Sequence, residues 1–140
     1  MRKIITLLAV LTMVGCYSTP TLANNTEPKT EIMARVTYYW PGSGGQNGRQ
    51  TSTGNIATGG KTVAVDPKII PYGSKIIIPK MEKVFVAHDT GSAVVSRKAS
   101  KKLGKDNIVI DIFCENRTEA QRKIKTYPMF MKIQIEKPKK

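Results

Sequence analysis

Six short runs rich in β-branched and aromatic residues, separated by glycine and proline, restrict the fold of this chain more than any other feature. Residues of these types favour strands, and each run is short for a helix. The sequence therefore predicts strands at residues 32–40, 61–67, 74–80, 83–89, 107–113 and 129–137. Because closing a sheet removes its exposed edges, we predict a mostly β fold, a small closed six-stranded β-barrel.

Helix-forming sequence is scarce. Residues 117–125 predict one short helix with Asn116 or Thr118 as N-cap, and residues 96–104 predict another that is capped by Ser96. Residues 41–55 contain five glycines, which is typical of a long loop.

The first 23 residues have the pattern of an export signal, since a basic start precedes an apolar stretch, residues 4–14, that is too short to span a bilayer. Two processing routes fit. Cleavage after Ala23 would release a soluble protein that starts near Asn24, whereas a lipobox-like site would make Cys16 a lipid-bearing N-terminus. We expect a secreted or cell-envelope protein that touches the membrane only if Cys16 is acylated.

The remaining chain predicts one domain at residues 31–137, with a polar linker at 24–30 and a basic tail at 138–140. That domain is large enough to fold around a core without disulfides. Cys114 is its only cysteine, and the sequence favours a small buried residue over a nucleophile there, because His88 is the only histidine.

The net charge of the chain indicates which classes of binding partner it attracts. Without Arg2 and Lys3 the chain has 21 basic and 10 acidic residues, a formal charge of +11, which attracts polyanions such as a bacterial wall, anionic lipid or DNA. Many lysines lie in residues 96–107 and at the C-terminus, where a solvated face and a frayed tail are the plain interpretations. The basic segment contains no aromatic residue for base stacking, so we expect no nucleic-acid partner.

The sequence does not favour a metal or nucleotide cofactor, because it has one histidine, no spaced Cys and His set, and no phosphate-binding glycine loop.

Three aspartates are candidates for a catalytic site. Asp66, Asp89 and Asp111 each lie at or near the end of an apolar run, and carboxyls that meet at one mouth raise the pKa of one of them, as a general acid requires. Asp66 and Asp89 also precede turn residues, so capping of backbone amides is an equal alternative for them.

Residues 51–79, 86–94 and 109–113 carry the motifs "VAVDPKIIPYGS", "HDTGSAV" and "VIDIF". In order and spacing they resemble the three-aspartate, or 3D, domain of bacterial wall-cleaving proteins, and the resemblance extends over about residues 32–135. It implies a double-psi β-barrel related to membrane-bound lytic transglycosylase A and to stationary-phase muralytic enzymes. It further implies that Asp111 is the catalytic acid/base and that Asp66 and Asp89 line the same groove.

The chain departs from that pattern at Ser92, where glycine is common, at Val109, where arginine is common, and in the basic insertion 96–107.

The resemblance implies an exported peptidoglycan lytic transglycosylase, an enzyme that needs one carboxyl and forms 1,6-anhydro-muramoyl ends. Thr51 and Ser52 are candidates for sugar hydrogen bonds. Trp40 and Tyr38 are candidates for sugar stacking, although Trp40 suits the core equally well. The alternative is a non-catalytic wall-binding module, similar to expansin and barwin proteins.

Overall fold

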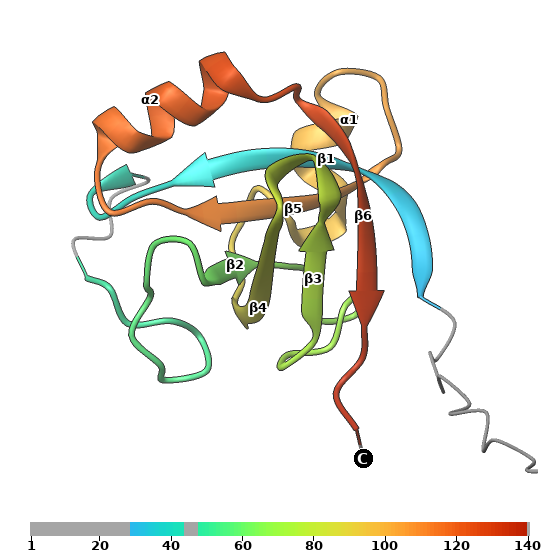
Figure 1. Ribbon diagram of the computed structural model, residues 1–140, viewed down its shortest axis with the longest axis horizontal. Helices are drawn as coiled ribbons and strands as arrows, with labels where there is room; N and C mark the ends of the chain where they lie inside the picture. Colours follow the sequence, from blue (N-terminus) through green and yellow to red (C-terminus); the bar gives the residue numbers. More distant parts are fainter. Residues whose placement is uncertain (1–28, 44–47, 140) are drawn as a thin grey trace, which may run out of the picture.

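The structure is a computed structural model that describes residues 29–43 and 48–139 (Figure 1). The expected export signal, the cleavage site at Ala23 and the lipobox-like Cys16 lie outside the described residues. No helix in the described part of the chain is long and apolar enough to cross a membrane.

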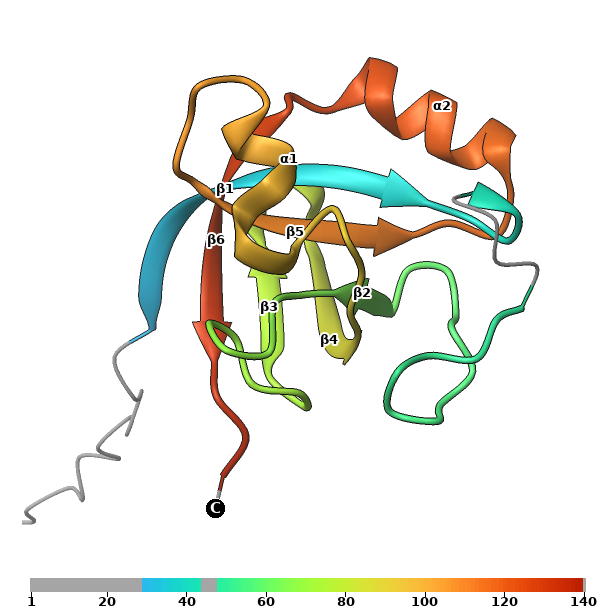
Figure 2. The same ribbon diagram turned by 180° about the vertical axis from the view of Figure 1, so that it is seen from behind.

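Six strands close into a barrel in the order β1-β5-β2-β4-β3-β6, which confirms the predicted fold class. Their bounds are β1 (Thr30–Tyr39), β2 (Thr62–Ala64), β3 (Lys75–Ile78), β4 (Lys83–Asp89), β5 (Ile108–Phe113) and β6 (Phe130–Glu136). Two short helices, α1 (Lys98–Lys101) and α2 (Arg117–Thr126), lie against the outside of the barrel, and α2 packs along β1 (Figures 1 and 2). Two 3-10 turns complete the elements, η2 (Pro79–Met81) and η3 (Val95–Arg97).

Strand β5 lies between β1, with which it is parallel, and β2, with which it is antiparallel. In this register Asp111 is the partner of Thr37 on one side and of Ala64 on the other. The carboxyl therefore projects from an interior strand whose backbone is paired on both edges, which is a rigid mounting for a functional side chain.

Alternation along β5 explains how an acid fits in an apolar run. Ile110 and Ile112 point into the barrel and join its core, with 0% exposure each. Because successive side chains point to opposite faces, Asp111 shares the outer face with Val109 and Phe113. Cys114 is buried directly after the strand, in the position that the sequence favoured.

The helix expected at residues 96–104 differs from the structure, which has only the four-residue α1 there. Ser96 and Arg97 both have left-handed backbone angles, with φ of 54° and 57°, so Ser96 does not cap a helix. The other expected helix is confirmed as α2, and Asn116 is its N-cap, accepting a 2.9 Å hydrogen bond from the Glu119 amide.

Candidate functional site

A pocket of about 350 Å³ lies on the outer face of β5, between the glycine-rich loop and the segment that follows β4. Its walls come from residues 38–40, 48–50 and 89–93, and both Asp111 and Phe113 face it from β5. The pocket thus brings Asp89 and Asp111 together with the three aromatic residues at the end of β1, Tyr38, Tyr39 and Trp40.

Asp111 is the partly buried carboxyl of this pocket. Its Oδ1 accepts a 2.8 Å hydrogen bond from the Thr37 hydroxyl. Burial raises the pKa of Asp111 to about 6, the Thr37 hydrogen bond opposes that rise, and the nearby charge of Asp89 adds to it. Within residues 29–43 and 48–139 no cation forms an ion pair with this carboxyl. Near neutral pH a larger fraction of Asp111 is therefore protonated than of an ordinary aspartate, and that proton can pass to a neighbouring atom.

Asp89, unlike Asp111, is surrounded by several hydrogen-bond donors. Its Oδ2 accepts from the Tyr39 hydroxyl at 2.8 Å, and its Oδ1 accepts from the Ser52 amide, the Ser52 hydroxyl and the Thr90 amide at 2.9 to 3.0 Å. Four donors around two oxygens suit an ionised carboxylate, which can only accept. Asp89 thus supplies a fixed negative charge beside Asp111.

Asp66 does not line this pocket. The residue is 6% exposed, and its two carboxylate oxygens accept from the backbone amides of Lys68 at 3.0 Å and Ser96 at 2.9 Å. This is the amide-capping arrangement that the sequence left open as the alternative. Asp66 holds the turn after β2 against η3, next to one wall of the pocket.

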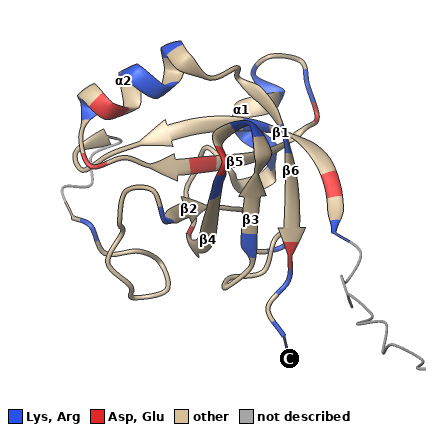
Figure 3. Ribbon diagram, in the orientation of Figure 1, with Lys and Arg blue, Asp and Glu red and all other residues tan. Residues whose placement is uncertain are grey.

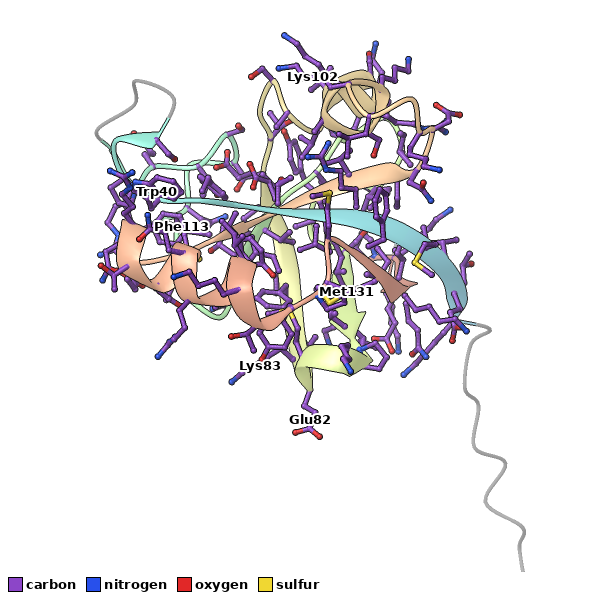
Figure 4. All side chains as sticks on the ribbon, turned by 90° about the horizontal axis from the view of Figure 1, so that it is seen from above. Trp40, Glu82, Lys83, Lys102, Phe113 and Met131 are labelled. Atoms are coloured by element: carbon purple, nitrogen blue, oxygen red, sulfur yellow. The ribbon has the colours of Figure 1, made fainter. Side chains whose placement is uncertain are left out.

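The aromatic residues at the end of β1 all reach the pocket. Tyr39 packs edge to face on Phe113, with ring centroids 5.3 Å apart. Trp40 and Phe113 lie at the same end of the barrel (Figure 4). Tyr38 also packs against the barrel core, and burial raises its pKa to about 12. Both Tyr38 and Trp40, the expected stacking residues, are therefore at the pocket wall.

The two polar loop candidates have different positions. Ser52 touches the site through Asp89, to which its amide and hydroxyl donate. Thr51 is 5% exposed and donates to the Asn55 carbonyl at 3.0 Å, so its hydroxyl shapes its own loop. Neither side chain forms part of the pocket wall.

Sequence reasoning missed several residues of the site. Thr37 lies opposite Asp111, and Thr90 has a buried hydroxyl with no partner among the described residues. Arg49 lies 5.4 Å from the Phe113 ring centre and pairs with Glu115, which ties the glycine-rich loop to the end of β5. Only the threonine of the "DTG" segment had a local signal, because the other contacts depend on strand order.

No group of three metal-ligating side chains gathers among the residues that the structure describes. The side chains that line the pocket include carboxyls, hydroxyls, aromatic rings and the guanidinium of Arg49.

Residues 61–134 match the family of the 3D domain. The chain belongs to the 3D domain family. Within the cell wall-binding protein YocH of Bacillus subtilis (strain 168), the chain is 33% identical over 100 residues, which is 69% of this chain and 30% of YocH. The chain thus spans about a third of the curated relative that it matches.

Among solved structures, the 3D domain chain is similar to the lytic transglycosylase LtgG of Burkholderia pseudomallei. The identity is 19% and the TM-score is 0.39, over 63% of this chain and 25% of that chain. At that score the similarity supports no argument about the activity.

Proposed function

We propose that this 3D domain protein is an exported peptidoglycan lytic transglycosylase that cleaves the bond between N-acetylmuramic acid and N-acetylglucosamine. The observation that carries the proposal is the raised pKa of Asp111, a partly buried carboxyl that lines an open pocket. Burial and the charge of Asp89 raise that pKa to about 6. A general acid of a glycosidase needs such a carboxyl, one whose pKa is raised toward neutral pH and that is able to reach substrate.

The proposed reaction uses one carboxyl twice. Asp111 donates its proton to the glycosidic oxygen as the C1–O bond breaks, and positive charge develops at C1 and the ring oxygen. The Asp111 carboxylate then takes the proton of the muramoyl 6-hydroxyl while that oxygen bonds to C1. The products are a free 4-hydroxyl on N-acetylglucosamine and a 1,6-anhydro ring, and no water is consumed.

The fixed charge of Asp89 has two roles in this scheme. In the resting enzyme it adds to the rise in the pKa of Asp111 and so increases the fraction of the carboxyl that is protonated near neutral pH. During cleavage the same charge, held by Tyr39 and Ser52, stabilises the positive sugar ring. Trp40 and Tyr38 line the pocket, and in this scheme their rings stack on the flanking sugars.

A second function is favoured by one finding, the name of YocH as a cell wall-binding protein. In that case the pocket holds the glycan without cutting it, and Asp111 serves as a hydrogen-bond donor. Under either function we propose the cell envelope or its exterior as the location and peptidoglycan as the partner.

Purified sacculi separate these functions. We expect wild-type protein to release soluble muropeptides that are lighter by one water than hydrolytic products, as mass spectrometry can measure. Asp111→Asn keeps the shape but cannot deliver the proton, so it should fold and bind sacculi yet release nothing. Products that contain the extra water would indicate a hydrolase. Binding by wild type without any release would establish the wall-binding function, and unchanged cleavage by Asp111→Asn would remove Asp111 from the mechanism.

A further inference from the structure

A second cavity, of about 370 Å³, adjoins the pocket. Ser92 and Ala93 line both spaces, so the two are adjacent there. The far side of the second cavity is built by Lys98, Ala99, Lys102 and Leu103, from α1 and the turn that follows it. The basic insertion 96–107 thus forms part of a concave surface next to the proposed active site.

The cavity is positively charged. Arg35, Lys98 and Lys102 line it and no acidic residue does. None of the three forms an ion pair within the described residues, whereas the neighbouring Arg97 is paired with Asp106. Lys and Arg colour much of α1 in Figure 3, and Lys102, directly after α1, projects outward in Figure 4.

Arg35 is the fixed cation of this group. It lies on β1, its guanidinium donates to the Ala99 carbonyl, and its Nε is buried without a hydrogen-bond partner in the described part of the chain. The bond to Ala99 uses one of the five guanidinium N–H groups, and Arg35 lines the cavity, so its other terminal N–H groups are suited to binding an anion such as a carboxylate or phosphate.

The remaining lining distinguishes between anions. Ala93, Ala99 and Leu103 give the cavity an apolar part, and Leu103 is 48% exposed. A polyol phosphate has no apolar surface to place there. A short peptide of alanine and acidic residues has methyl groups and carboxylates within a few bonds of one another, which matches a surface of small apolar and basic side chains.

We propose that this cavity binds the carboxylates of the short alanine-containing peptide attached to the muramic acid of peptidoglycan, while the glycan lies in the adjoining pocket. The inference rests on the proposed wall-directed function. It gives the basic insertion a role, the preference for strands that still carry peptides over bare glycan. Because Ser92 and Ala93 line both spaces, a side branch of a glycan in the pocket lies next to the cavity.

Equilibrium binding to soluble glycan strands tests the inference. Strands free of teichoic acid are compared with the same strands after an amidase has removed the peptides, so that phosphate plays no part. All proteins carry Asp111→Asn, which prevents cleavage during the measurement. The test variant is Lys98→Ala with Lys102→Ala, and the matched control is Lys101→Ala with Lys105→Ala, which removes equal charge from exposed positions outside the cavity.

We expect the test variant to bind peptide-bearing strands about 3- to 10-fold more weakly than its parent, since Lys98 and Lys102 are exposed and each such charge contact contributes modestly. Its binding to bare strands, and both affinities of the control variant, should remain at the level of the parent. Equal losses on both kinds of strand, or an equal loss in the control variant, would overturn the inference alone. If the parent binds neither kind of strand, the proposed function fails and the inference fails with it. If the test variant binds more weakly than its parent only on glycan strands that retain teichoic acid, the cavity binds phosphate instead.

Discussion

The Thr37 hydroxyl donates a 2.8 Å hydrogen bond to Oδ1 of Asp111, and the same two residues are register partners in the parallel pair β1 and β5. The carboxyl of the proposed acid is therefore oriented by a neighbour that the sheet itself places. Side chains mounted on paired strands keep their positions better than side chains on loops. The hydrogen bond also adjusts acidity, because it stabilises the charged form and lowers the pKa that burial raises.

Thr37→Val removes this donor and keeps the shape of the side chain. The pKa of Asp111 should then rise above its value of about 6, so the acid stays protonated to higher pH. We expect the decline of muropeptide release with pH to move to higher pH in this variant. Carboxyl-carbon NMR titration of Asp111 measures the same shift directly. Thr37→Ser retains the donor and should behave like wild type, and a profile that is unchanged in Thr37→Val would contradict the role of this hydroxyl.

Asp111→Asn should make the protein more stable at neutral pH. The ordinary pKa of 3.8 applies to the unfolded chain and the raised pKa of about 6 to the native one, so the native state binds more protons between these values. Stability that this group contributes is thus present at low pH and is lost as pH rises through about 6. Asparagine does not ionise, and the variant should gain up to about 3 kcal/mol at pH 7.5, an upper limit for a partly exposed group.

Urea unfolding at pH 7.5 and pH 4.5 checks this expectation, because the gain should shrink at the lower pH. Glu82→Gln is the matched control, since Glu82 projects away from the barrel and far from Trp40 (Figure 4). A gain that is equal at both pH values would show that it arises from something other than ionisation.

The strands were predictable because their apolar residues alternate or cluster in short runs between glycines and prolines, as in residues 74–80 and 107–113. The ends of the strands were less predictable than the strands themselves. Strand β2 has three residues rather than the seven expected, since the chain bends at the irregular register between Val63 and Ala64 and leaves the sheet before Asp66. The short helix at residues 96–104 was shortened by two left-handed residues, which no local signal marks.

The site depends on strand order, which a single sequence does not contain. The meeting of Asp89 with Asp111 could be anticipated from their strand ends, and both line the pocket. Thr37 joins them only because β5 pairs with β1, which lies about seventy residues away in the chain. Asp66 stays apart because backbone amides satisfy both of its oxygens.

Asp66→Ala tests this structural role. It leaves the amides of Lys68 and Ser96 without their acceptor in a partly buried place, at a cost of about 1 kcal/mol of unfolding free energy. Asp66→Asn retains one acceptor oxygen and should lose less. Denaturant unfolding gives both values, and activity at a temperature where both variants remain folded should be reduced rather than abolished. Complete inactivity of Asp66→Asn at wild-type stability would instead place Asp66 in the catalytic machinery.

Glu115 anchors the glycine-rich loop over the pocket. Its Oε1 accepts a 2.6 Å hydrogen bond from the Gly59 amide and its Oε2 pairs with Arg49, whose guanidinium lies 5.4 Å from the Phe113 ring centre. Glu115→Ala frees that loop without touching Asp111. The exposed ion pair and the amide bond together contribute modestly, so we expect glycan binding to weaken by about 3- to 10-fold.

The pH at which activity declines should stay where it is in Glu115→Ala, because neither Thr37 nor Asp89 is altered. Steady-state kinetics on soluble glycan strands across pH separates the two quantities. Glu31→Ala is the matched control, since Glu31 forms a 2.9 Å ion pair with Lys132 elsewhere on the barrel surface and lies outside the pocket wall. If Glu115→Ala moves the pH midpoint and leaves binding intact, Glu115 acts on the charge of the site and not on the position of the loop.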